Sequence, residues 1–255
     1  MARGSFPLPK FSLRPGEFSG MMAEPAQYPM RKENAMLKYP CLVLDHDDTV
    51  VRSEETVNYP AFLKALEALR PGMSVSLEDF TLWTFREGFF EMCVNHFQFS
   101  QADFQKQYSI WLSYVMSHTP PCFPGIAPIL KRQRQEGGRI CVVSHSARDN
   151  ILRDYQVHFG LEPDCIFGWE LGPELRKPAP YPLDQIMSMY GASPETLLVV
   201  DDMKSGYDMA KTRGVCFAWA GWFRRNVPEV ASLMSRYSDF SFDTPEALEQ
   251  FLFTP

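Results

Sequence analysis

Acidic residues occur at two places in the chain, each directly after a short apolar run. Asp45 and Asp47 form one pair, and Asp201 and Asp202 form the other. Asp45 and Asp47 are two residues apart, so in extended backbone their side chains project to the same side. If the two pairs meet in the fold, up to four negative charges share one site, and a cation must neutralise them. Oxygen-only ligands favour Mg²⁺.

A hydroxyl group and an amine accompany these acids in the sequence. Ser144 follows another apolar run, and Lys177 lies in a turn-rich stretch, residues 176–182. Lys177 and a cation would offset the charge of a phosphoryl group, while Ser144 and backbone amides near Ser146 would donate hydrogen bonds to it. This mixture of groups predicts a phosphoryl-transfer site.

Short apolar runs that alternate with amphipathic segments must position these residues. We predict strands at 41–44, 140–143, 165–167, 197–200 and 215–218, because these runs are short and mostly β-branched or aromatic. Ser146, with Asp149 three residues later, is expected to cap one of the intervening helices. The alternation predicts a Rossmann-like α/β fold with a parallel sheet. Ligands bind such sheets at the carboxyl ends of the strands, where the candidate residues lie.

The interval between the first two predicted strands carries only helical patterns. We therefore expect an all-helical domain, residues 56–119, inserted into a core formed by residues 36–55 and 120–255. Two connectors would join them, which makes hinge motion plausible. An apolar stripe at helical spacing is expected to lie in the core of the insertion. Its members are Phe104, Tyr108, Trp111, Leu112 and Val115.

Composition narrows the class of protein. The 255 residues are 45% hydrophobic and 22% charged, typical of a globular protein, and no apolar run is long enough to cross a membrane. The formal charge of −6 gives no reason to attract nucleic acid. Six scattered cysteines without a CxxC pair indicate thiols in a reducing, cytoplasmic compartment. Residues 1–35 are proline-rich and lack periodicity, so we expect a disordered tail or tag.

The candidate residues resemble the four motifs of the haloacid dehalogenase superfamily, in the usual order. The matching residues are Asp45-x-Asp47-x-Thr49, Ser144, Lys177 and Asp201-Asp202. Lys177-Pro-x-Pro and Asp201-Asp-x-x-x-Gly206-x-x-x-Ala210 are similar to the third and fourth motifs of the phosphoglycolate phosphatase and β-phosphoglucomutase branch. Members of that branch carry a helical cap between the first two motifs. The resemblance covers roughly residues 39–255.

The resemblance implies a role for each residue. Asp45 would attack phosphorus and form an aspartyl-phosphate, and Asp47 would act as general acid and then as general base. Ser144 and Lys177 would bind the phosphoryl group. Mg²⁺ would be held by the Asp45 carboxylate, the Asp47 main-chain carbonyl and Asp202, with Asp201 bound directly or through water. The implied activity is Mg²⁺-dependent hydrolysis of a small phosphorylated metabolite.

Two alternatives remain open at this stage. Mutases of the branch carry a histidine twelve residues after the nucleophile, where this chain has Val57. A non-catalytic binding protein of the same fold would be expected to lack Asp45, Asp47 or Lys177, and all three are present. The substrate and the oligomeric state do not follow from the sequence.

Several other polar residues are weaker candidates. Alternation along the first strand turns His46 away from the phosphate, whereas a substrate-facing position is one option for His145. In the insertion, polar residues among aromatic ones are candidates for the cap surface above the phosphate, although solvated surface is the simpler interpretation. They are Arg86, Glu87, Asn95 and His96.

Overall fold

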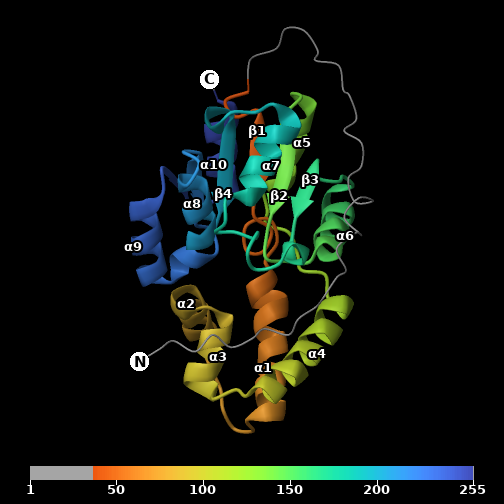
Figure 1. The fold of residues 1–255 in the computed structure, drawn as a ribbon, viewed down its shortest axis with the longest axis vertical. Coiled ribbons are helices and arrows are strands. Elements are labelled where there is room, and N and C mark those ends of the chain that lie inside the picture. The colour runs from red at the N-terminus through yellow and green to blue at the C-terminus, as the bar shows by residue number, and fades with distance from the viewer. Residues whose placement is uncertain (1–36, 255) are drawn as a thin grey trace. The chain divides into compact units, whose positions relative to one another are not determined.

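A parallel sheet forms the centre of the sheet domain (Figure 1). In the computed structural model, which describes residues 37–254, six strands pair in the order β3-β2-β1-β4-β5-β6, all of them parallel. The strands are β1 Cys41–Leu44, β2 Arg139–Val143, β3 Cys165–Phe167, β4 Leu197–Asp201, β5 Cys216–Ala220 and β6 Phe240–Phe242. The predicted α/β class is confirmed. The predicted tail, residues 1–35, lies outside the described residues.

The register of the sheet determines where the site forms. Strand β1 lies between β2 and β4, and Leu44 at its end is level with Val142 and Val200. The Asp45 amide then donates to the Val200 carbonyl at 2.9 Å, which continues the pairing by one residue. Because all strands run in the same direction, the side chains after β1, β2 and β4 are brought to the same edge of the sheet.

Helices cover both faces of the sheet. Along β1, Leu42 and Leu44 pack with helices α5, α6 and α10, while Cys41 and Val43 pack with α7, α8 and α9. This alternation is the period of two that a strand buried on both faces requires. The helices are α5 Ile126–Gln135, α6 Arg148–Phe159, α7 Tyr181–Tyr190, α8 Lys204–Lys211, α9 Pro228–Tyr237 and α10 Pro245–Phe253.

The insertion between β1 and β2 is helical, as predicted, and we call its four α-helices the cap. After a π-helical turn, Glu54–Asn58, come α1 Tyr59–Leu69, α2 Leu77–Glu87, α3 Phe89–Phe97 and α4 Gln101–Ser117. Phe62 of α1 is at the centre of an aromatic cluster, with ring centroids 5.1–6.3 Å from its partners. The partners are Phe80, Phe89, Phe97 and Phe99. The cap therefore has an apolar core of its own.

One strand was missed and two expectations about local structure were wrong. Strand β6 was not predicted, because a serine interrupts its short apolar run. In the α4 stripe, Val115 is buried but Tyr108 and Leu112 are exposed, because α4 packs chiefly on α1. Ser146 does not cap α6, whose N-cap residue is Ala147, because the Ser146 hydroxyl bonds to Asp47 instead.

Within residues 37–254, the structure contains no helix that is both long and apolar enough to cross a lipid bilayer.

The aromatic cluster of the cap gives a prediction about stability. Phe62 is 1% exposed, so Phe62→Ala should lower the free energy of unfolding by about 3–5 kcal/mol through lost burial and the cavity left behind. Urea unfolding followed by circular dichroism measures this change. Met116→Ala, at a position that is 75% exposed, is the control and should change stability by less than about 0.5 kcal/mol. Equal stabilities of the two variants would contradict the prediction.

Candidate active site

Lys177 connects two of the predicted acids. Its Nζ atom donates to Asp45 Oδ1 and to Asp201 Oδ2, both at 2.6 Å. All three side chains are buried. Burial disfavours the lysine charge, but Asp201 and Asp45 outweigh it and raise the Lys177 pKa above its ordinary value. Lys177 is therefore a fixed positive charge between the ends of β1 and β4.

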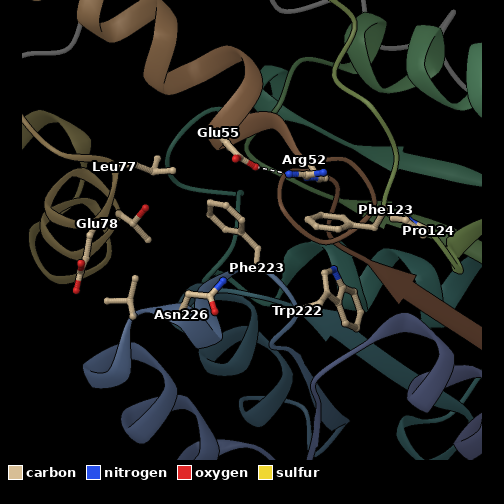
Figure 2. Close-up of a pocket in the computed structure, with 11 residues that line it drawn as sticks. Arg52, Glu55, Leu77, Glu78, Phe123, Pro124, Trp222, Phe223 and Asn226 are labelled. Atoms are coloured by element: carbon tan, nitrogen blue, oxygen red, sulfur yellow. Dashed lines mark hydrogen bonds and ion pairs between the residues drawn. The ribbon is translucent and has the colours of Figure 1, made fainter.

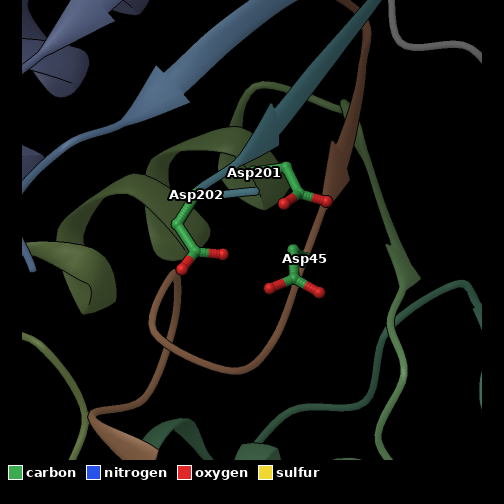
Figure 3. A group of neighbouring side chains, drawn as sticks. All are labelled: Asp45, Asp201 and Asp202. Carbon is green, nitrogen blue, oxygen red and sulfur yellow. The ribbon is translucent and has the colours of Figure 1, made fainter. Parts of the chain in front are cut away.

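Asp202 joins these residues to form a carboxylate cluster (Figure 3). One oxygen atom from each of Asp45, Asp201 and Asp202 lies within 4.8 Å of the others. Burial raises the pKa of Asp201 to about 8, against the opposing effect of Lys177. Burial also raises the pKa of Asp202 to about 6, although Arg224 opposes the shift. Full ionisation of the buried cluster is therefore costly, and a bound cation would offset that cost.

Hydrogen bonding distinguishes Asp202 from Asp201. Both Asp201 oxygens are engaged, because Oδ1 accepts from the Met203 amide at 2.8 Å and Oδ2 accepts from Lys177. Asp202 Oδ2 accepts from Arg224, but its Oδ1 atom is buried and has no partner among the described residues. An unpartnered buried carboxylate oxygen is costly unless a cation or a donor binds it. Together with the oxygen-only donor set, this atom fits Mg²⁺.

The loop after β2 brings two hydroxyl groups to the site. Ser144 is buried, and its Oγ atom accepts from the Ser146 amide at 3.2 Å. The Ser146 hydroxyl in turn donates to Asp47 Oδ2 at 2.5 Å. The sequence analysis did not include the Ser146 side chain among the site residues. Its position two residues after Ser144 could have indicated it, since it repeats the spacing of Asp45 and Asp47.

Arg224 is a second residue that the sequence analysis missed. It lies in the 3₁₀ helix Arg224–Asn226 beyond β5, is 4% exposed, and contacts three carboxylates. Its Nε atom donates to Asp202 Oδ2, and its Nη2 atom lies 3.0 Å from Glu54 Oε2 and 3.4 Å from Asp48 Oδ2. Burial disfavours the charge of Arg224, but these acids outweigh it and raise its pKa. It does not directly follow the end of β5, so the strand-end pattern did not indicate it.

Asp48 has an unusual backbone that this cluster explains. Its φ angle of 57° lies in the left-handed region, which is unfavourable for a residue with a side chain. The Asp48 carboxylate accepts from the Glu54 amide at 3.0 Å and contacts Arg224. Burial, followed by the charge of Glu54, raises the Asp48 pKa well above its ordinary value. The loop after β1 is thus held to the start of the π-helical turn.

Two histidines flank the predicted motifs. His46 points away as expected: its Nε2 atom lies 3.1 Å from Asp154 Oδ2, and its ring stacks on Tyr155. His145 Nε2 donates to the Lys177 carbonyl at 2.9 Å and so helps to hold the turn that carries Lys177. Partial burial and the charge of Lys177 lower the His145 pKa to about 4. Contact of His145 with a substrate stays a prediction.

Most of the polar cap candidates bind one another. Glu87 accepts hydrogen bonds from Asn95 at 2.8 Å and from His96 at 2.9 Å, and the His96 ring stacks on Trp83. Arg86 instead reaches across to the sheet domain and forms a two-point ion pair with Glu229 of α9.

A cavity of about 590 Å³ lies where the cap meets the sheet domain (Figure 2). Helix α2 contributes to one wall, and the segment after β5 closes the other side. The first connector, residues 45–58, and the second connector, residues 118–125, also contribute. The lining residues are Arg52, Glu55, Leu77, Glu78, Thr81, Phe123, Pro124, Trp222, Phe223, Asn226 and Val227. None of the predicted catalytic or metal-binding residues lines it.

Comparison with known proteins identifies the family. The family model for haloacid dehalogenase-like hydrolases matches residues 42–220, which is more than half of the chain. The chain therefore belongs to the haloacid dehalogenase-like hydrolase family and is a hydrolase of that fold, which confirms the resemblance seen in its motifs. A search of curated proteins finds no significant match.

Solved structures share the fold at low sequence identity. A protein from Bacteroides fragilis, described as a haloacid dehalogenase-like hydrolase, is 20% identical, with a TM-score of 0.68 over 83% of this chain and 100% of its own. A protein from Lactobacillus delbrueckii subsp. bulgaricus, described as a phosphoglycolate phosphatase, is 19% identical, with a TM-score of 0.70. The match covers 86% of this chain and 100% of that protein. CbbY from Rhodobacter sphaeroides, solved in complex with phosphate, is 19% identical, with a TM-score of 0.63. The match covers 84% of this chain and 96% of CbbY.

Gly206 of α8 provides a test of the Lys177 connection. A Cβ atom at this position would overlap the Asp201 carboxylate, so Gly206→Ala should displace Asp201 and weaken its bond to Lys177. We expect the hydrolase activity to fall by about tenfold or more, since small displacements of positioning groups have effects of this order. Ser205→Ala, at the preceding position of the same helix, should leave activity unchanged. Full activity of Gly206→Ala would show that Asp201 is not needed where the structure places it.

The raised pKa values of Asp201 and Asp202 predict how stability depends on pH. A raised pKa favours the protonated group in the folded state, so its stabilisation is present at low pH and is lost as pH rises through about 6 and about 8. Mg²⁺ can replace these protons, so its stabilising effect should grow with pH.

We therefore expect saturating Mg²⁺ to raise Tm more at about pH 8 than at about pH 5.5. Scanning calorimetry with and without Mg²⁺ measures the difference, and Asp202→Asn should remove most of the increase. Asp208→Asn, on the exposed face of α8, should retain it. An equal rise in Tm at both pH values would contradict the prediction.

Proposed function

We propose that this hydrolase is a Mg²⁺-dependent phosphatase that cleaves a small phosphorylated metabolite through an aspartyl-phosphate on Asp45. The observation that carries the proposal is the arrangement around Asp45. One of its oxygens is held by Lys177 at 2.6 Å, whereas Oδ2 accepts no hydrogen bond from the described residues. A carboxylate fixed at one oxygen and free at the other is suited to nucleophilic attack.

The surrounding groups have complementary tasks in this mechanism. Asp45 attacks phosphorus, while Lys177 offsets the negative charge of the phosphoryl oxygens. Ser144, whose Oγ atom accepts from the Ser146 amide, would donate its hydroxyl hydrogen to the same oxygens. Asp201, bonded to Lys177 and to the Met203 amide, keeps the ammonium group in position. Each of these groups is buried, so their charges are only weakly screened.

Asp47 would move the proton in both steps. It gives a proton to the leaving alcohol and then takes one from the water that hydrolyses the aspartyl-phosphate. The Ser146 hydroxyl bonds to Oδ2 of Asp47, which leaves Oδ1 for the transferred proton. Mg²⁺, held by Asp45, the Asp47 carbonyl and Asp202, with Asp201 nearby, would supply positive charge against the phosphoryl oxygens.

Three further observations support this proposal, two on the reaction and one on the location. Val57, at the position where mutases of the branch carry a histidine, is buried and apolar and cannot return a proton to a second hydroxyl. CbbY, which shares the fold, has been solved in complex with phosphate, in line with a phosphorylated ligand. All six cysteines are free thiols, which supports a cytoplasmic location.

A phosphate-release assay across a panel of metabolite phosphomonoesters, with and without Mg²⁺, tests the function. We expect Mg²⁺-dependent release from at least one ester, and a loss of about 10³-fold or more in kcat for Asp45→Asn. Asp208→Asn removes a carboxylate outside the site and should retain wild-type turnover. Intact turnover of Asp45→Asn would refute its role as nucleophile. Isomerisation of a sugar phosphate without release would instead establish a mutase.

A further inference from the structure

Arg224 links the ion site to a segment outside it. Its Nε atom binds Asp202 Oδ2, and its Nη1 and Nη2 atoms lie 3.4 and 3.0 Å from the two oxygens of Glu54. The guanidinium group is planar and rigid, so its two ends cannot move independently. A shift of Glu54 therefore rotates Arg224 and changes the contact with Asp202.

Glu54 in turn binds the cap. It opens the π-helical turn of the first connector, and its Oε1 atom accepts a hydrogen bond from the Thr81 hydroxyl of α2. Glu54 is 5% exposed and Thr81 is 2% exposed. Asp202, Arg224, Glu54 and Thr81 thus form an unbroken chain of bonds between buried side chains, which we call the relay. Such bonds are strong because water does not compete for them.

The orientation of Asp202 depends on this relay. One of its oxygens is held by Arg224, and the other, Oδ1, is buried without a partner among the described residues. If Arg224 shifts, the carboxylate turns and Oδ1 leaves its present direction. The relay therefore sets the direction of the oxygen that is best placed to bind a cation.

The cavity between the cap and the sheet domain gives the relay room to move. Thr81 of α2 and Phe223, which precedes Arg224, both line it. Side chains packed against empty space can shift at lower cost than side chains in a filled core. On this side α2 therefore borders open space, although Leu82 and Phe85 on its other side pack against the sheet domain.

We propose that Arg224 is a positioning residue that couples divalent-ion binding to the position of the cap, with Thr81 as the contact on the cap. The proposal rests on the ion site of the proposed function. Thr81 touches none of the predicted ion ligands, yet it sets part of the affinity for the ion. By linkage, the bound ion stabilises the docked position of α2 by the same factor.

Calorimetric titration of the full chain with Mg²⁺ in the absence of substrate tests the coupling. Thr81→Val keeps the shape of the side chain and removes the hydroxyl, and it should raise the Kd for Mg²⁺ by about fivefold or more. Thr84→Val is the matched control, because among residues 37–254 the Thr84 hydroxyl on the same helix bonds to Met92 Sδ within the cap and to no residue of the sheet domain. It should change the Kd by less than about twofold. Thr81→Ser restores the hydroxyl and should recover the affinity.

Hydrogen exchange gives a readout that a merely structural role of Thr81 would not change. Mg²⁺ should slow amide exchange in α2 of the wild type, and this effect should shrink in Thr81→Val but not in Thr84→Val. If valine is not accommodated, Thr81→Ala compared with Thr84→Ala provides the same comparison. Wild-type affinity and a full Mg²⁺ effect on exchange in a folded Thr81 variant would refute the coupling alone. A wild type that binds no Mg²⁺ would refute both the proposed function and the coupling.

Discussion

The confinement of several carboxylates in a space closed to water is the constraint on which the rest of the structure depends. The buried acids of this space are Asp45, Asp48, Glu54, Asp201 and Asp202.

Two buried cationic side chains bind these acids. Lys177, from the turn before α7, binds the acids at the ends of β1 and β4. Arg224, from the segment after β5, binds Asp202 and the acids of the first connector. Each cation carries unit charge, so the acids outnumber them, and burial, with a smaller effect of the neighbouring acids, raises the pKa values of Asp48, Asp201 and Asp202. A bound divalent ion would relieve it.

The sheet makes this confinement possible because its register sets the distances. Parallel pairing places the ends of β2, β1 and β4 at one level, and helices on both faces keep water from the strands. The acids come from backbone that the sheet already fixes, so little further ordering is needed to hold them together. Asp201 shows the consequence most directly: a neighbouring amide, a lysine and the absent Cβ of Gly206 all determine where its carboxylate lies.

Much of this site could be predicted from the sequence, because a short apolar run followed by a polar residue marks the end of a buried strand. Asp45, Ser144 and Asp201 each follow a run of buried apolar residues, so their meeting follows from topology alone. Arg224 could not be placed in the same way, since it lies beyond a strand end in a 3₁₀ helix and its partner Glu54 is 170 positions away. The role of Ser146 was predicted wrongly for another reason: its spacing to Asp149 is that of a helix cap, but its hydroxyl bonds to Asp47 instead.

The exposed residues of α4 show a further limit of prediction from sequence. Periodicity identifies the apolar face of a helix, but it does not indicate how much of that face a neighbouring helix covers.

The separate aromatic cluster of the cap has an evolutionary consequence. Phe62 and its ring partners join α1, α2 and α3 in an apolar core that contains no residue of the sheet. Mutations on the outer faces of these helices can therefore accumulate while the chemistry at the strand ends persists. Changes in the part of the gene that encodes the cap surface can therefore leave the fold of the other part intact.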